Sequence, residues 1–150
     1  MVASVLVLCV GNICRSPVGE RLLKMGLPNL RVGSAGLHAL VGQPADSDAS
    51  AAARRQGIDV SGHKARQFTP ELGTAHDLIL VMEHSHRNEI ARQFPHLSGR
   101  TMLFGQWLSG TPDVLDPYRR PPEAHDETVT LLSAGAKAWS QRLSQNYRVN

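Results

Sequence analysis

The chain has 150 residues, of which 41% are hydrophobic and 19% charged, and its formal net charge is +3. This length and apolar content fit one compact domain, residues 1–150, with little room for a second. The basic residues are scattered rather than gathered in a run, which suits an anionic substrate and argues against a nucleic-acid partner.

The first predicted element is a strand at residues 4–8, which ends at a Gly-Asn turn. This apolar stretch has no basic leader, so we expect a buried strand rather than a signal peptide, and no stretch is long enough for membrane insertion. A helix follows, with Ser16 expected as its N-cap, Pro17 at its first position and Gly26 at its end in a left-handed conformation.

Strands and helices continue to alternate along the chain. The predicted strands are 31–34, 77–82 and 101–104, and the predicted helices are 46–56, 84–94 and 123–145, the last with an apolar stripe of Val129, Leu132, Ala136 and Trp139. This order predicts an α/β fold, a three-layer sandwich with a four-stranded parallel sheet and helices on both faces. In such folds the ligand lies beyond the carboxyl ends of the strands.

The segment that joins the first strand to the first helix predicts a phosphate-binding loop. Five residues separate Cys9 from Arg15, and their N–H groups can converge on one anion beside the positive end of the helix. Gly11 and Asn12 tolerate the left-handed backbone that such a curl requires. Arg15 offers a planar fork that matches two phosphate oxygens, and the surrounding donors favour Cys9 as a nucleophilic thiolate.

An isolated cysteine at a strand end is usually an inert small hydrophobe, but the combination with Arg15, Ser16 and Pro17 favours the catalytic interpretation for Cys9. Two interpretations of Cys14 stay open: it fills space, or it captures an oxidised Cys9 as a reversible disulfide. With only two cysteines, both near the start, we expect a cytoplasmic protein without a disulfide framework.

A carboxylic acid is the remaining requirement for phosphate ester cleavage. Asp116 lies before a proline in the loop 109–122, which is rich in Pro, Asp and Gly, and we expect it to protonate the leaving oxygen and later to activate water. Such Asp-Pro pairs are usually only turns, and Asp113 is a nearby rival.

The run Cys9-Val-Gly-Asn-Ile-Cys-Arg-Ser-Pro17, together with Asp116-Pro-Tyr118, resembles the low-molecular-weight protein tyrosine phosphatases, and the resemblance covers nearly the whole chain. Residues 39–42 and 116–120 are most similar to bacterial members associated with exopolysaccharide or capsule tyrosine kinases. The resemblance implies catalytic roles for Cys9, Arg15 and Asp116. The partner that it implies is a phosphotyrosine protein, with a bacterial tyrosine autokinase as the specific candidate.

The resemblance also assigns supporting residues. Ser16 donates to the Cys9 thiolate, and Asn12, Ser34 and His63 hold the loop in its strained shape. The expected substrate-binding residues are Val10, Gly11, Asn12, Ile13, Cys14, Ser16, Leu40 and Tyr118. Leu40 stands where many animal members carry an aromatic residue, which leaves Tyr118 as the aromatic wall.

Alternative functions are phosphoarginine or small-molecule phosphatase activity, or a non-catalytic phosphopeptide-binding module. Relatives that act on phosphoarginine usually have threonine at the position of Ile13, so isoleucine favours the tyrosine-directed branch. Arsenate-reducing relatives use a further cysteine pair late in the chain, and this sequence has no cysteine after Cys14.

We expect no cofactor and no metal. His84 and His86 are two residues apart, which does not place them on one helix face, so both are interpreted as solvated surface histidines. Trp107 and Trp139 are interpreted as core aromatics. Arg119 and Arg120 either attract acidic phosphotyrosine segments or form a solvated basic corner.

Overall fold

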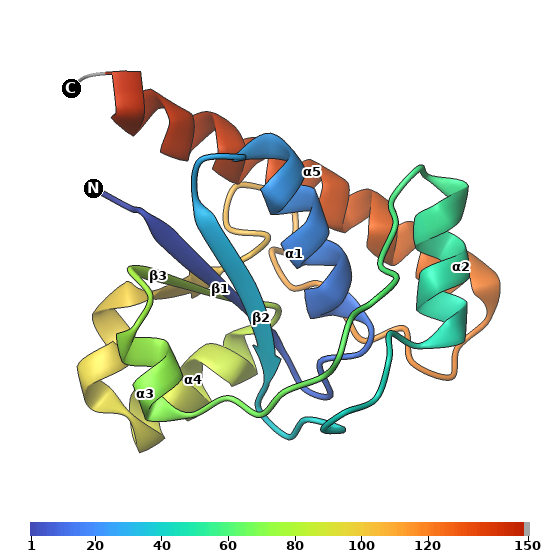
Figure 1. Cartoon of the computed structure of the whole chain (residues 1–150), viewed down its shortest axis with the longest axis horizontal. Coiled ribbons are helices and arrows are strands. Elements are labelled where there is room, and N and C mark those ends of the chain that lie inside the picture. Colours follow the sequence, from blue (N-terminus) through green and yellow to red (C-terminus); the bar gives the residue numbers. More distant parts are fainter. Residues whose placement is uncertain (149–150) are drawn as a thin grey trace.

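The computed structural model describes residues 1–148 and contains one four-stranded sheet (Figure 1). Its strands are β1 (Ser4–Cys9), β2 (Arg31–Gly36), β3 (Leu78–Val81) and β4 (Thr101–Leu103). They are arranged in the order β2-β1-β3-β4, and every neighbouring pair is parallel. This arrangement confirms the predicted α/β fold with a four-stranded parallel sheet.

The central strand β1 is buried along its whole length because both faces of the sheet are covered. Val5, Val7 and Cys9 belong to the core on one face of the sheet, whereas Leu6 and Leu8 belong to the core on the other. This alternation is the two-residue period of a strand, so one short segment supplies both cores.

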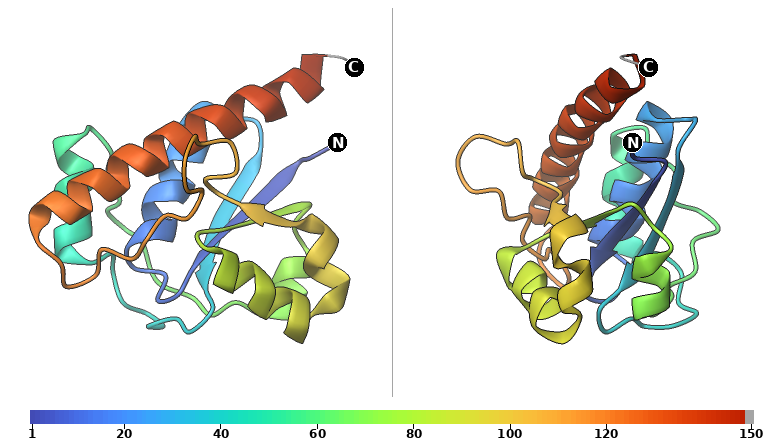
Figure 2. Two further views of the ribbon diagram at one scale, coloured as in Figure 1. Left: turned by 180° about the vertical axis from the view of Figure 1, so that it is seen from behind. Right: turned by 90° about the vertical axis from the view of Figure 1, so that its left-hand side faces the viewer.

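Helices cover both faces of the sheet. The core that includes Val5 and Val7 is closed by α1 (Arg15–Gly26), α2 (Ser47–Arg55) and α5 (Pro122–Arg148), and the opposite core by α3 (Pro70–Thr74), α4 (His84–Gln93) and the 3-10 helix η1 (Pro95–Arg100). The two views of Figure 2 keep α5 on one side of the sheet and α4 on the other. Among residues 1–148, no helix is long and apolar enough to cross a membrane.

Helix α1 differs from its prediction in its N-cap residue and in the conformation of Gly26. It begins at Arg15, with Cys14 as the N-cap residue, and the Ser16 hydroxyl inside the first turn bonds to the side chains of Cys9 and Asn12 instead of capping a backbone amide. At its far end, Gly26 is still helical and has no positive φ. A side chain on Gly26 would collide with Ser140 Oγ, so this glycine permits the close approach of α1 and α5.

The two tryptophans also differ from each other. Trp139 is buried, as predicted, and its indole N–H donates to the carbonyl oxygens of Leu103 and Phe104. The prediction of a core position was wrong for Trp107, which is 39% exposed. Trp107 lies edge to face against Trp139, and the Arg142 guanidinium lies 3.4 Å from the centre of its ring. Trp107 therefore packs between the buried Trp139 and a cation at the surface.

Candidate active site

The loop between β1 and α1 curls at the carboxyl end of the sheet, as the sequence predicted. Asn12 has a φ of 58°, the left-handed conformation that asparagine tolerates better than most residues. The neighbouring strand must leave room for this curl. A Cβ atom on Gly36 of β2 would lie 2.5 Å from the carbonyl oxygen of Val10 and 3.0 Å from the amide nitrogen of Asn12, so glycine is required there.

The Asn12 side chain holds the loop from behind. Its Nδ2 donates to Ser16 Oγ at 2.7 Å and to Ser34 Oγ at 3.0 Å, and its Oδ1 accepts from the amide of Arg66 at 2.9 Å. His63 Nε2 donates to the Asn12 carbonyl oxygen at 2.6 Å. These bonds satisfy a buried amide and oppose the strain of its backbone.

The same network orients the Ser16 hydroxyl toward the candidate nucleophile. Ser16 Oγ already accepts a hydrogen bond from Asn12, so its own proton is available for Cys9 Sγ, which lies 2.9 Å away. A hydrogen bond donated to sulfur stabilises the thiolate relative to the thiol.

Cys14 provides a contrast, because it is a buried thiol at the other end of the loop. Burial raises the pKa of Cys14 well above its ordinary value, and the negative charges of Asp46 and Cys9 raise it further. Cys14 therefore stays a neutral thiol near neutral pH. Cys9 and Cys14 are both free, so the space-filling and the disulfide-forming interpretations of Cys14 stay open.

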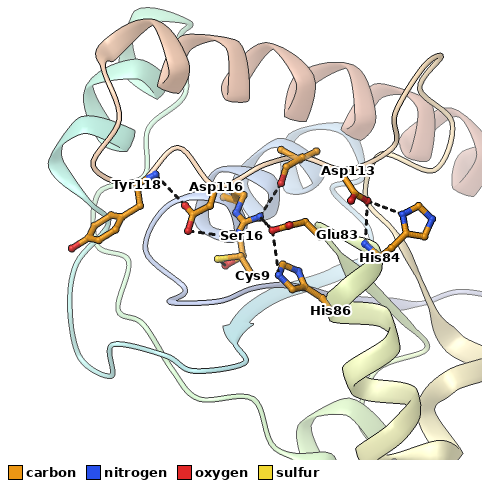
Figure 3. Close-up of polar contacts among 10 residues, drawn as sticks. Cys9, Ser16, Glu83, His84, His86, Asp113, Asp116 and Tyr118 are labelled. Atoms are coloured by element: carbon orange, nitrogen blue, oxygen red, sulfur yellow. Dashed lines mark hydrogen bonds and ion pairs between the residues drawn. The ribbon is translucent and has the colours of Figure 1, made fainter.

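Arg15 is the largest fully buried side chain of the site and is 1% exposed. Its Nη1 donates to Glu83 Oε2 at 2.6 Å and to the carbonyl oxygen of Val114 at 2.8 Å (Figure 3). Its Nε has no hydrogen-bond partner among the described residues, and Nη2 lies 3.7 Å from Asp116 Oδ2. The guanidinium is thus held through Nη1, while Nε remains available to an anion.

Glu83 and His86 form a second layer behind Arg15 that the sequence analysis missed. The Glu83 carboxylate that receives Arg15 also lies 3.4 Å from His86 Nε2 (Figure 3). The prediction of a solvated surface histidine was correct for His84 but wrong for His86, which is 5% exposed and lies against this carboxylate. Burial lowers the pKa of His86, and the Arg15 charge lowers it further, against the opposing effect of Glu83.

The two aspartates of the loop 109–122 have different partners. Asp113 Oδ1 accepts from the amide and from Nδ1 of His84, at 3.0 and 2.8 Å. Asp116 is 47% exposed, and its Oδ1 accepts from the amide of Tyr118 at 3.0 Å, which leaves Oδ2 beside Arg15 (Figure 3). Asp116 therefore lies at the site beside Arg15, whereas the Asp113 carboxylate is bonded to His84.

A cavity of about 190 Å³ opens over these groups. Its lining residues are Cys9, Val10, Gly11, Ile13, Cys14, Arg15, His38, Leu40, Asp116 and Tyr118. The structure thus gathers the three predicted catalytic residues and most predicted binding residues in one cavity. Asn12, Ser16, Ser34 and His63 lie behind the lining, and His38 was not predicted. Arg119, which also has a positive φ of 62°, stacks over Tyr118 at the rim, 5.2 Å from its ring centre.

This fold and loop define a family of phosphatases. Residues 4–149 match the sequence model described as low molecular weight phosphotyrosine protein phosphatase, and the chain belongs to that family. The family predicted from the motifs is therefore confirmed.

Particular relatives are similar over almost the whole chain. The low molecular weight protein-tyrosine-phosphatase Etp of Escherichia coli K12 is 44% identical over 142 residues, which are 95% of each chain. The crystal structure of the tyrosine phosphatase Wzb from Escherichia coli K30 in complex with sulphate is 46% identical with a TM-score of 0.93, covering 95% of this chain and 99% of that one. The YwlE arginine phosphatase from Geobacillus stearothermophilus is 30% identical with a TM-score of 0.88, covering 95% and 94%.

Proposed function

We propose that the chain hydrolyses phosphotyrosine in proteins through a phosphocysteine intermediate. The observation that carries this proposal is the convergence of Cys9, Arg15 and Asp116 on one cavity. In the first step the Cys9 thiolate attacks phosphorus, the bond from phosphorus to the tyrosine oxygen breaks, and Asp116 gives its proton to that oxygen. The acid is needed because a free phenolate has a conjugate acid with a pKa of about 10.

The second step releases phosphate and restores the enzyme. The Asp116 carboxylate takes a proton from water, the water oxygen attacks phosphorus, and the bond from phosphorus to sulfur breaks to regenerate the Cys9 thiolate. Arg15 and the loop amides stabilise the equatorial oxygens in both steps, since their positions are fixed before the reaction begins. Glu83 and the Val114 carbonyl contribute by holding the guanidinium in place.

The walls of the cavity support an aryl phosphate as substrate. Leu40 and Tyr118 are exposed at its mouth, and Ile13 is buried in its lining. A flat aromatic ring can lie between an aliphatic and an aromatic wall while its phosphate reaches the loop. Phosphoarginine is the competing substrate, because arginine phosphatases are among the relatives, and isoleucine at position 13 is the sequence feature that argues against it.

The proposed protein substrate is a bacterial tyrosine autokinase of polysaccharide export, and the proposed location of the reaction is the cytoplasm. The similarity of residues 39–42 and 116–120 to the corresponding bacterial phosphatases supports this partner. Arg119 and Arg120 are exposed beside the cavity and add positive charge for a segment that carries several phosphates. The two free cysteines suit a reducing compartment.

Initial rates on matched phosphotyrosine and phosphoarginine peptides test the proposal, with EDTA present throughout. We expect a higher kcat/KM for the phosphotyrosine peptide and no turnover by Cys9→Ser protein. Equal or preferential cleavage of phosphoarginine would overturn the substrate assignment. Turnover that survives Cys9→Ser would overturn the mechanism, and tight peptide binding without turnover by the unchanged chain would favour a binding module.

A further inference from the structure

Three side chains of the types that can ligate a metal lie close together outside the active site. Asp46 and Asp48 lie at the start of α2, and His125 lies in the first turn of α5. One ligand atom of each side chain lies within 4.8 Å of the other two. Figure 1 shows α2 beside the first turns of α5, and the Arg55–Asp126 ion pair at 2.7 Å joins the same two helices.

The two aspartates alone have an ordinary explanation. Asp46 Oδ2 accepts from the amide of Ala49 at 3.1 Å, which makes Asp46 the N-cap of α2, and Asp48 is an acidic residue in the first turn. Both positions favour carboxylates because the helix amino terminus is the positive end of its dipole.

His125 has no such explanation. Its side chain is 1% exposed, and neither Nδ1 nor Nε2 has a hydrogen-bond partner among the described residues. Leaving a buried polar group without a partner is costly, so buried imidazoles are ordinarily paired. One His125 nitrogen instead lies within 4.8 Å of an oxygen of each carboxylate, and a nitrogen together with carboxylate oxygens is a familiar ligand set for a transition metal.

We propose that Asp46, Asp48 and His125 bind a divalent transition-metal ion, with Zn²⁺ as the best fit. Zinc accepts imidazole and carboxylate ligands together at about 2.0–2.2 Å, whereas Mg²⁺ and Ca²⁺ prefer oxygen ligands alone. Ligand atoms around a tetrahedral ion with such bonds are about 3.3 Å apart. The ligand atoms here lie within 4.8 Å of one another, so binding would require a small adjustment, which the exposed side chain of Asp48 would supply.

The ion would act as a brace and not as a participant in phosphate cleavage. The amide of Asp46 donates to the carbonyl oxygen of Ile13 at 2.8 Å, so the site adjoins the phosphate loop through the backbone. His125 follows the loop 109–122 in the chain. The bound ion would therefore join α2 to α5 next to the two segments that carry Cys9 and Asp116. The sequence analysis predicted no metal on the basis of His84 and His86. It did not identify this site because Asp46 and Asp48 are far from His125 in the sequence.

Calorimetric titration of Zn²⁺ into metal-free Cys9→Ser protein tests the proposal, because this background removes the competing thiolate. We expect saturable binding of about one ion per chain. Asp48→Asn and His125→Asn should each raise the Kd for Zn²⁺ at least tenfold. Substitution of a residue that only supports a metal ligand already lowers metal affinity by about 10- to 100-fold. At a hundredfold excess over Kd, Zn²⁺ should raise Tm by about 5–10 °C, and each substitution should remove most of this shift.

The matched controls are His96→Asn, which changes an exposed histidine, and His84→Asn, which disrupts the surface pair with Asp113. Both should bind Zn²⁺ like the Cys9→Ser parent. Absence of saturable binding by the parent would overturn the proposal, and so would binding that survives Asp48→Asn. If His125→Asn fails to fold by circular dichroism, Asp48→Asn decides alone, because it changes an exposed side chain outside the core.

Discussion

Replacement of Asp116 by asparagine separates the role of its proton from that of its shape. Asparagine keeps the oxygen that accepts from the Tyr118 amide at 3.0 Å, so the loop should retain its conformation. It cannot donate a proton as an acid to the tyrosine oxygen. A positioned general acid contributes about 10²- to 10⁴-fold, which is about 2.7–5.5 kcal/mol of transition-state stabilisation. We expect Asp116→Asn to lower kcat for a phosphotyrosine peptide by this factor.

Asp113→Asn is the matched control for this experiment, because it makes the same change three residues earlier in the same loop. Asp113 is bonded to the largely exposed His84, and such a surface pair is worth about 0–1 kcal/mol of stability. We expect kcat to change by no more than about fivefold, which is the rate equivalent of 1 kcal/mol.

The assay compares kcat for a phosphotyrosine peptide and for p-nitrophenyl phosphate, and it measures inhibition by inorganic phosphate. The loss in Asp116→Asn should be smaller for p-nitrophenyl phosphate, since its leaving group needs less protonation, and phosphate inhibition should change little. Equal losses in Asp113→Asn and Asp116→Asn would refute the assignment of the acid, as would full activity of Asp116→Asn.

Three further predictions concern the support of the site and of the fold. Ser16→Ala should reduce kcat/KM and the rate of Cys9 alkylation at neutral pH by about 10- to 100-fold, because a hydrogen bond to a charged group is lost. The Ser34 hydroxyl bonds to Asn12 and not to Cys9, so Ser34→Ala should have a smaller effect. Equal losses in the two variants would contradict the role of Ser16. Leu132→Ala, a change in a fully buried side chain of α5, should lower the free energy of unfolding in urea by about 2–5 kcal/mol, and a loss below 1 kcal/mol would contradict the packing. Burial lowers the pKa of His76, so below about pH 6.5 the unfolded chain binds more protons than the folded chain. The free energy of unfolding should therefore decrease as the pH is lowered through this range, by at most about 1.4 kcal/mol per pH unit for this group. His76→Gln should reduce this loss of stability at acid pH, and an unchanged pH dependence would contradict the prediction.

The sheet was predictable because β1 and β3 are short apolar runs, and because strands and helices alternate along the chain. The helices α3 and η1 were not predicted, since five or six residues are too few to display a helical period. Helix α1 ends at Gly26 as predicted, but the backbone conformation of this glycine was predicted wrongly for a different reason. A glycine at a helix end suggests a left-handed cap, whereas here it allows close contact with Ser140, which lies in another helix.

The candidate site was predictable where its chemistry is local in the sequence. Cys9 and Arg15 share one loop, and Asp116 was identified by its loop and by the family motif. Glu83 and His86 could not be identified in this way, because their importance arises from a contact with Arg15 that only the folded chain creates. An acidic residue directly after a buried strand at the carboxyl edge of the sheet was the one available signal for Glu83.

Trapping of the covalent intermediate tests the account most directly. Wild-type protein is mixed with a phosphotyrosine peptide, quenched in acid within the first turnover, digested and analysed by mass spectrometry. We predict one phosphoryl group on the peptide that contains Cys9, and none in Cys9→Ser protein treated in the same way. Phosphate release without a labelled Cys9 peptide, or a label on another side chain, would contradict the claim that this sulfur attacks phosphorus.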